Sequence, residues 1–418
     1  VNGAFEALGT IKLDGNYPTG TNNVALGDTA LDSGSLSGGN NTAIGNAALT
    51  VNTSGVDNTA VGDLSLDANT TGGRNTAIGR VSLSSNTTGG DNVSIGRSAL
   101  TSNSTGCKNV AVGYGALLSN TEANDNIAVG YQSLEQNTTG TSNIAVGCGA
   151  LESNTTASDN VAMGKRALGG TTTGCRNTAM GRAAMNGNST GDTNVAVGYS
   201  ALYSNTTADN NTAVGSQALC TNTTGAHNVA VGARAGDANT TGTQNTFVGG
   251  DYNGGPGGAN TTGGCNTFIG NDSGMKNTTG SFSTSVGAES SCNGTTSHSN
   301  AALGYKALKL LTTGNHNVAI GREAMISNTT GTRNTGIGAY ALYGNTTAEA
   351  NTAVGYSALE TNTTGAYNTA VGTLALDTNT TGASNTALGY NVLTSNTTGI
   401  QNVAVGACAL DANIGAAN

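Results

Sequence analysis

Few residues in this chain belong to the types that carry most enzymatic chemistry, and they form no recurring set. The 418 residues include three histidines, His227, His298 and His316, none at a repeated spacing from an acidic residue. The Ser, Thr and Asp residues follow a short repeat, so a triad assembled from them would be a chance selection. The sequence contains no phosphate-binding glycine loop, no Cys-x-x-Cys pair and no Gly-Gly-x-Gly-x-Asp calcium motif. We therefore expect no enzymatic activity, no cofactor and no metal site.

The elements that position these residues follow from a period of 17. An Asn-Thr/Val-Ala-Val/Ile-Gly motif returns from Asn23 to the end of the chain in 23 copies, with five inserted residues. A fixed short period indicates one supersecondary unit stacked on itself, each copy touching mainly its neighbours. The predicted domains are a short N-terminal arm or cap, residues 1–22, and one repeat domain, residues 23–418.

Each copy, numbered 1–17 from its Asn, has fixed residue types at several positions. Position 4 is aliphatic and position 5 is Gly in every copy, position 9 is mostly Leu or Met, and positions 12–15 usually read Asn-Thr-Thr-Gly. So much Gly, Asn and Thr excludes a helix, whereas Val, Ile and Thr favour strands. We expect the glycines at 5 and 15 to take positive φ at corners. The prediction is an all-β β-solenoid (β-roll), an elongated rod of about 23 rungs and roughly 110 Å, with two short strands per rung.

Residues at one position should form a ladder along the stacked rungs. Stacked Asn amides at position 1 can hydrogen-bond to one another. Position 17 alternates in charge from Asp57 through Arg74, Asp91 and Lys108 to Asp125, which favours parallel, in-register stacking. Two consecutive copies supply the predicted structural ladder residues Asn58, Val61, Gly62, Leu66, Asn75, Ile78, Gly79 and Leu83.

Position 3 is Ala in most copies and is never charged. Adjacent strand residues point to opposite faces, so position 3 points outward if position 4 fills the interior. An outward stripe of small apolar side chains suggests burial against another chain. We therefore predict a lateral interface at Ala111, Ala128 and Ala145. In the alternative arrangement, Ala points inward in a thin coil and the position-4 side chains point outward.

The period is disturbed between residues 233 and 300. Here Gly236, Asn253, Gly274 and Ser291 replace the position-9 Leu, Phe247, Phe268 and Phe282 appear, and residues 251–259 carry a Gly-Gly-Pro-Gly-Gly insertion. We interpret this stretch as a bulged loop over repacked rungs, in which Phe fills the space of the absent Leu. A recognition patch is the alternative interpretation.

The last copy is a complete rung, and such a rung exposes unpaired backbone groups that can template another chain. We predict a head-to-tail contact between this rung and the N-terminal arm of a second molecule, which would generate a filament. The residues of this predicted axial interface are Phe5, Leu8, Ile11, Asn402, Val405 and Leu410.

Seven cysteines are present: Cys107, Cys148, Cys175, Cys220, Cys265, Cys292 and Cys408. Cys107 and Cys175 share position 16 but lie four rungs apart, about 19 Å at strand spacing, which is beyond disulfide reach. Cys220 and Cys292 share position 10 and are also four rungs apart. We expect free thiols, with interchain bonds as a minor alternative.

The Asn-Thr-Thr turns match the N-glycosylation acceptor pattern, as at Asn69 and Asn86. Glycans on adjacent rungs would crowd at about 5 Å, so we favour a turn with an Asn ladder. Threonine ladders also raise ice binding, which we disfavour because no clear outward Thr-x-Thr strand is evident.

Composition limits the partners. The net charge is −9 and the Lys and Arg residues are scattered, which disfavours a nucleic-acid partner. No apolar stretch is long enough for a membrane span. No signal peptide is evident, and Val1 suggests a processed, secreted chain.

The repeat resembles a known type. Asn-Thr-Ala-Ile-Gly-x-x-Ala-Leu-x-x-Asn-Thr-Thr-Gly, seen for instance from Asn351 onward, is similar to the head repeats of trimeric autotransporter adhesins. It resembles still more closely the repeats of phage tail-fibre-like and bacterial surface proteins that end in an intramolecular-chaperone domain. The resemblance covers nearly all of residues 23–418. It implies a left-handed β-roll, often trimeric, on an extracellular fibre, and it supplies no catalytic residues.

These observations predict a non-enzymatic structural subunit of a self-assembling extracellular or cell-surface filament that serves attachment. Its partner would be itself, in a head-to-tail filament, a homotrimer or both. The alternative is the shaft or head of a trimeric adhesin or phage (virion) tail fibre that binds a cell-surface receptor or glycan. In that case the irregular stretch or the tyrosines would make the contact, among them Tyr114, Tyr131, Tyr199, Tyr356 and Tyr390.

Overall fold

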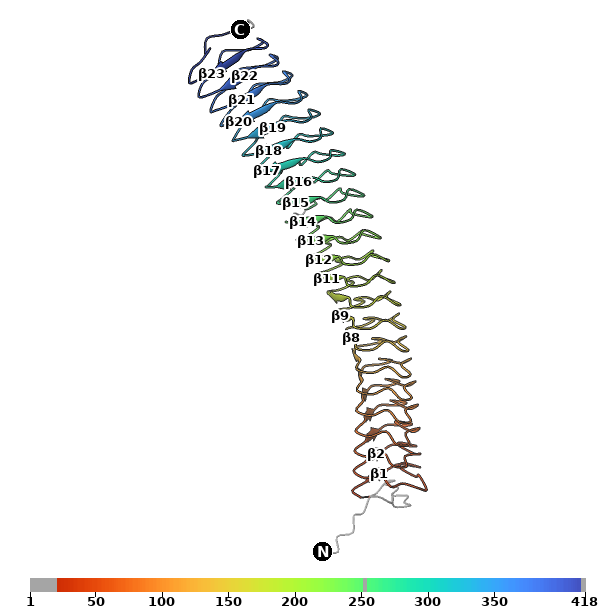
Figure 1. Cartoon of the computed structure of the whole chain (residues 1–418). Coiled ribbons are helices and arrows are strands. Elements are labelled where there is room, and N and C mark those ends of the chain that lie inside the picture. The colour runs from red at the N-terminus through yellow and green to blue at the C-terminus, as the bar shows by residue number, and fades with distance from the viewer. Residues whose placement is uncertain (1–20, 251–253, 415–418) are drawn as a thin grey trace, which may run out of the picture. The chain divides into compact units, whose positions relative to one another are not determined.

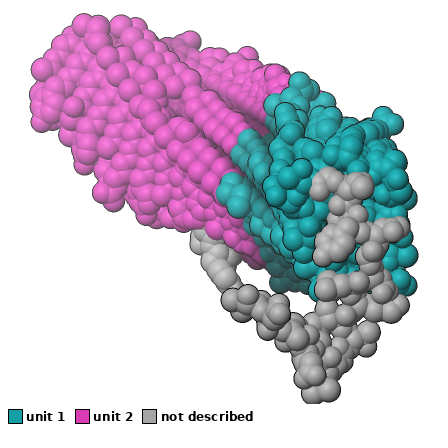
Figure 2. All heavy atoms as spheres, turned by 90° about the horizontal axis from the view of Figure 1, so that it is seen from below, with its two compact units in different colours: residues 1–196 teal, residues 197–418 magenta. Residues whose placement is uncertain are grey.

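A computed structural model of the protein describes residues 21–250 and 254–414. These residues form an all-β fold without helices, in which 23 three-residue strands succeed one another along the chain (Figure 1). The predicted β-solenoid is confirmed. The predicted arm, residues 1–22, lies almost wholly outside the described residues. The chain divides into two units, residues 1–196 and 197–418, which Figure 2 distinguishes by colour.

The first unit contains β1 (Val24–Leu26), β2 (Thr42–Ile44), β3 (Thr59–Val61), β4 (Thr76–Ile78), β5 (Val93–Ile95), β6 (Val110–Val112), β7 (Ile127–Val129), β8 (Ile144–Val146), β9 (Val161–Met163) and β10 (Thr178–Met180). β11 (Val195–Val197) spans the boundary between the units. The second unit contains β12 (Thr212–Val214), β13 (Val229–Val231), β14 (Thr246–Val248), β15 (Thr267–Ile269), β16 (Thr284–Val286), β17 (Ala301–Leu303), β18 (Val318–Ile320), β19 (Thr335–Ile337), β20 (Thr352–Val354), β21 (Thr369–Val371), β22 (Thr386–Leu388) and β23 (Val403–Val405).

Each strand occupies positions 2–4 of one rung, and neighbouring strands pair in parallel without a shift in register. In the first unit Ala60 lies opposite Ala77, and in the second Ala353 lies opposite Ala370. Hydrogen bonds between rungs continue around the coil beyond the strands, for example from Leu66 N to Ser82 O at 3.0 Å. Sequence period and strand register therefore coincide, as the charge alternation at position 17 predicted.

The predicted second strand of each rung is absent from the described residues. Positions 7 and 9 instead adopt left-handed backbone conformations, as at Leu64 (φ 54°) and Leu66 (φ 53°), and the segment is a series of turns. Two left-handed residues separated by one other residue prevent extended backbone. The prediction of two strands per rung was wrong for this reason.

The glycines at positions 5 and 15 of the repeat occur for different structural reasons. Gly at position 5 has positive φ, 134° at Gly79, and a Cβ there would lie 2.6 Å from the carbonyl oxygen of Gly96 on the next rung. Gly at position 15 does not have positive φ, contrary to the prediction; at Gly72 a Cβ would lie 2.3 Å from Gly89 O. At position 5, φ and the close approach between rungs together require glycine. At position 15 the close approach favours glycine, but Ala also occupies this position, as at Ala123 and Ala157.

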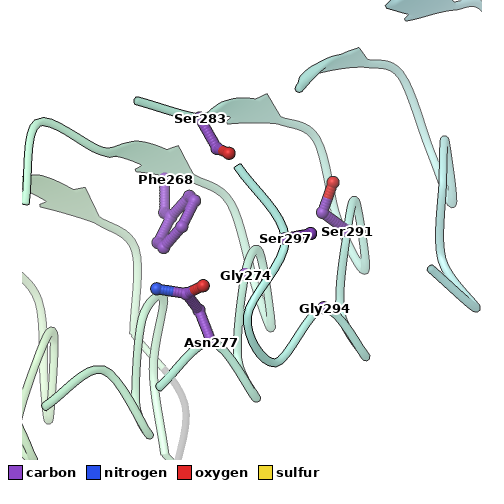
Figure 3. A pocket seen from close by; sticks show the side chains of 7 residues that line it. All are labelled: Phe268, Gly274, Asn277, Ser283, Ser291, Gly294 and Ser297. Atoms are coloured by element: carbon purple, nitrogen blue, oxygen red, sulfur yellow. The ribbon is translucent and has the colours of Figure 1, made fainter. Parts of the chain in front are cut away.

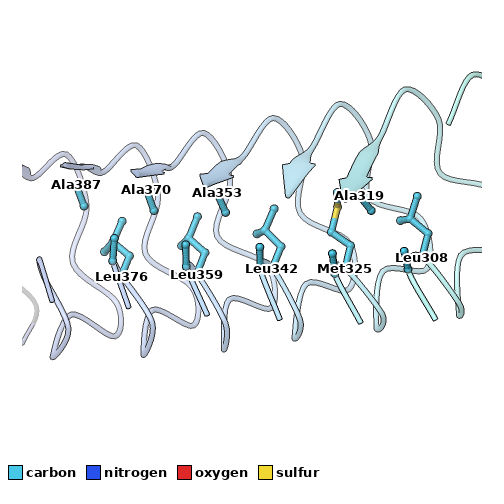
Figure 4. Packing of buried hydrophobic residues seen from close by; sticks show 14 of the residues in the cluster. Leu308, Ala319, Met325, Leu342, Ala353, Leu359, Ala370, Leu376 and Ala387 are labelled. Carbon is cyan, nitrogen blue, oxygen red and sulfur yellow. The ribbon is translucent and has the colours of Figure 1, made fainter. Parts of the chain in front are cut away.

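The interior of the coil is filled from positions 3, 8 and 9. Ala at positions 3 and 8 and Leu at position 9 are fully buried in nearly every rung. In Figure 4 the alanines of successive strands, such as Ala353 and Ala370, face a row of leucines that includes Leu342 and Leu359. The coil is thin, so one wall must carry a methyl group for the opposite wall to carry an isobutyl group.

This packing overturns the predicted lateral interface. Ala111, Ala128 and Ala145 are all 0% exposed within the single chain. Their side chains contribute to the core of their own coil, and the position-4 side chains point outward, which is the alternative arrangement considered above. Lysine at these three positions would bury charge in the core and would not probe a contact between chains.

The irregular stretch follows the same packing rule with the large residue on the other wall. Phe247 and Phe268 occupy position 3 and are almost fully buried. A Cβ on Gly236 or Gly257 would lie within 2.4 Å of the Phe247 ring, and one on Gly274 within 2.6 Å of the Phe268 ring. The interpretation that Phe fills the space of absent Leu is confirmed for these two residues.

Two details of that interpretation need correction. Gly257 takes the place of position 9 in its rung, because its N–H donates to Ser273 O at 3.0 Å as a position-9 amide does. Asn253, which the spacing placed there, lies outside the described residues. Phe282 fills no core space, since it is 67% exposed.

Candidate functional site

The residues considered for catalysis remain dispersed. His298 Nδ1 accepts a hydrogen bond from Ser281 N at 3.0 Å, so this ring completes the hydrogen bonding between two rungs. The seven cysteines are all free. Within residues 21–250 and 254–414, no group of three His, Cys, Asp or Glu side chains is placed to hold a metal ion. In the part of the chain that the structure describes, the three histidines and seven cysteines do not come together as an active site.

Two ladders of buried asparagine side chains run from rung to rung and hydrogen-bond to one another. At position 1, Asn58 Nδ2 donates to Asn41 Oδ1 (3.1 Å) and to Gly72 O (2.9 Å). At position 12, Asn69 Nδ2 donates to Asn52 Oδ1 (2.9 Å) and to the same Gly72 O (3.0 Å). In rungs that have Asn at both positions, two amides thus hold the turn carbonyl at position 15, and the predicted Asn ladder is confirmed.

The position-12 ladder explains the Asn-Thr-Thr sequence without a glycan. The acceptor residues Asn69 and Asn86 are 0% exposed, and their Nδ2 atoms are engaged in hydrogen bonds. A sugar on Nδ2 would replace one of its two hydrogens and so remove one of these bonds, and it would not fit in the folded coil. Threonine at position 13 also serves the stack, since Thr70 Oγ1 donates to Thr87 O at 3.0 Å.

The outer sheet face, which we define as the side chains at positions 2 and 4 of the strands, is the main apolar surface of each unit. Ile78 is 39% exposed, Met163 41% and Leu303 49%. None of the residues at positions 2 and 4 is charged in any copy. On the side of the second unit that Figure 2 shows, side chains of successive rungs form parallel rows. Val61 and Ile78, predicted as structural ladder residues, belong to this face.

Charge and aromatic residues lie at the edges of the coil. At position 17, Arg74 forms two hydrogen bonds with Asp91, with Nε to Oδ1 at 2.5 Å and Nη2 to Oδ2 at 2.9 Å. This hydrogen-bonded pair raises the pKa of Arg74 and lowers that of Asp91. At position 6, the exposed rings of Tyr114 and Tyr131 stack with centroids 5.4 Å apart.

Position 10 holds half-buried ionisable groups. Burial raises the pKa of the carboxyls of Asp67, Asp237 and Asp377. It also raises the pKa of the thiols of Cys220 and Cys292. Raised thiol pKa values leave these two cysteines mostly protonated and poorly nucleophilic.

The predicted axial interface is only partly described. Phe5, Leu8 and Ile11 lie outside the described residues. In the last rung, Asn402 is buried and its Nδ2 donates to Asn385 Oδ1 at 2.9 Å, whereas Val405 is 65% and Leu410 39% exposed.

Comparison with known proteins finds no family model and no curated protein that matches the chain. No helix in the described residues is long and apolar enough to cross a membrane.

Proposed function

We propose that this chain is a non-enzymatic structural subunit of an extracellular fibre that serves attachment to surfaces. One observation carries the proposal: the outer sheet face carries no charge and repeats at every rung, with Val, Ile, Leu or Met at position 4 and Thr, Val, Ile or Ala at position 2, while most polar side chains of the interior are hydrogen-bonded within the stack. Among the described residues, the repeats form a regular surface and no small-molecule-sized concave site with convergent polar groups, which is where small-molecule chemistry is normally found.

The partner of the outer sheet face in this proposal is a second copy of the chain. Two copies have the same rung spacing, so rows of Val and Ile on one meet equivalent rows on the other along many rungs. Burying exposed aliphatic side chains contributes about 25 cal/mol for each Å² removed from water, and no charge at positions 2 and 4 opposes the contact. The resemblance to trimeric fibre proteins agrees with lateral association of this kind.

The test is a charge substitution on this face. Replacing Val112, Val129 and Val146 at position 4 with lysine places three cations on adjacent rungs of the first unit. We expect the triple variant to run as a 40.8 kDa monomer in sedimentation while retaining its β circular dichroism. The matched control puts lysine at the exposed position-14 residues Thr88, Thr105 and Thr139 and should assemble as wild type. Equal assembly of both triple variants would exclude the outer sheet face as the contact.

A second candidate is the shaft or head of an adhesin or tail fibre that binds a receptor or glycan. The stacked pair Tyr114 and Tyr131, with Arg97 5.8 Å from the Tyr114 ring centroid, favours it as an exposed aromatic edge. Glycan-array binding that is lost on replacing both tyrosines with serine would support this function. A lack of binding to any glycan or target-cell surface would count against it.

A further inference from the structure

The rung that begins at Ser283 lacks the side chains that fill the other rungs. Position 1 is Ser283, position 9 is Ser291, position 12 is Gly294 and position 15 is Ser297, where most rungs have Asn, Leu, Asn and Gly. Both asparagine ladders are therefore interrupted in this rung, which is also the last of four consecutive rungs without Leu at position 9. The preceding rung compensates for its own missing Leu with Phe268, but position 3 of this rung is Ser285.

The missing side chains leave a cavity of about 10 Å³ that the centre of a water molecule can occupy. It is lined by Phe268, Gly274, Asn277 and the four residues at positions 1, 9, 12 and 15 of the rung (Figure 3). A volume of this size holds one water molecule, provided that polar partners are present.

Polar groups that can bond a water molecule line the cavity, and their hydrogen-bonding capacity is only partly used by the protein. Ser291 is 6% exposed, and its Oγ has no hydrogen bond. Asn277 Nδ2 donates to Asn260 Oδ1 and to Gly280 O, but the amide that would donate to Asn277 Oδ1 from the next rung is missing because Gly294 has no side chain. Ser283 Oγ is reached only by Asn300 N, at 3.4 Å.

We propose that this cavity is a binding site for one structural water molecule. The water donates to Asn277 Oδ1 in place of the missing position-12 amide and accepts a hydrogen bond from the Ser291 hydroxyl. It satisfies Asn277 Oδ1 at the end of one stretch of the position-12 ladder, which resumes only at Asn328 because the next rung has Leu311 at position 12. The lining carries no charged side chain, so the site selects a neutral donor and acceptor of water size.

The sign of a single stability change tests the proposal. If water satisfies Ser291 Oγ, Ser291→Ala removes a hydrogen bond and lowers the hydrogen-exchange protection of the amides of Gly274 and Ser291. If the cavity is dry, the same change removes an unpaired buried hydroxyl and raises that protection. Ser290→Ala is the matched control, because Ser290 Oγ donates to Gly287 O at 2.8 Å within the same rung. We expect both variants of the full-length chain to lose protection, by tenfold or less.

A second measurement examines occupancy directly. A density map of the full-length chain at water-resolving resolution should contain one peak within hydrogen-bond distance of Asn277 Oδ1 and Ser291 Oγ. In Gly294→Asn the new amide takes the position of the peak, which should vanish; a Cβ on Gly294 would meet only Ser297 Oγ closely, at 2.9 Å. An empty cavity in the wild-type map, or increased protection in Ser291→Ala, would overturn the proposal.

Discussion

Replacing one asparagine of the position-12 ladder with alanine should destabilise its rungs far more than a surface change does. Asn86 is fully buried; its Nδ2 donates to Asn69 Oδ1 and to Gly89 O, and its Oδ1 accepts from Asn103 Nδ2, each at 2.9 Å. Three buried hydrogen bonds contribute about 3 kcal/mol in total at about 1 kcal/mol each.

The partners left behind set the rest of the magnitude. Gly89 O keeps a bond from Asn75 Nδ2, and Asn103 Nδ2 keeps one to Gly106 O. Only Asn69 Oδ1 loses its described donor, which adds about 1 kcal/mol or more for an unpaired buried acceptor. The expected loss for Asn86→Ala is therefore about 4 kcal/mol of local stability, close to a thousandfold in hydrogen-exchange protection.

Hydrogen exchange read by mass spectrometry is the appropriate assay, because long repeat arrays need not unfold in a single step. Peptides covering residues 69–103 should lose protection, and peptides several rungs away should not. Thr88→Ala, at the exposed position 14 of the same turn, is the control and should change protection less than threefold. A comparable, small effect of both variants would refute the assignment of stability to the ladder.

Three further predictions follow from individual positions. Thr171 replaces Asn in the position-12 ladder, and both Thr171 Oγ1 and Asn154 Oδ1 are buried without partners, so Thr171→Asn should stabilise its rung by about 1–3 kcal/mol in the same exchange assay; no gain would contradict the ladder account. Gly79→Ala should destabilise the fold by more than about 2 kcal/mol because of the positive φ and the nearby carbonyl of Gly96. Ser98→Gly, at φ 57°, should stabilise it by up to about 1 kcal/mol, and similar melting temperatures for the two variants would contradict the described backbone. Burial raises the pKa of Asp377, so its ionised form destabilises the fold at neutral pH, and this destabilisation disappears as the pH falls through the raised pKa. Asp377→Asn should therefore raise the melting temperature at pH 7 but not at pH 3. An equal rise at both pH values would contradict burial of the charge.

The sequence was sufficient to predict the rungs, their parallel register and the asparagine ladder, because a strict 17-residue period places equivalent positions next to one another on neighbouring rungs. It did not determine which strand face is interior. Alternation requires Ala60 and Val61 to face opposite sides, but only the thickness of the coil decides that the methyl group goes inside. The absence of charge at positions 2 and 4 is equally compatible with burial and with an apolar surface.

The turn geometry could not be predicted for a different reason. Leucine disfavours left-handed backbone, so the residue types at Leu64 and Leu66 do not predict positive φ. The hydrogen bonds that neighbouring rungs impose override that local preference. At position 5, by contrast, invariant Gly signals positive φ directly, and the structure agrees at Gly62 and Gly79.

The measurement that tests the central claim most directly is cryo-electron microscopy of the purified full-length chain at micromolar concentration. We expect copies associated side by side, with the outer sheet face, positions 2 and 4 of the strands, buried between them. Isolated single chains, or assemblies in which that face remains open to solvent, would contradict it.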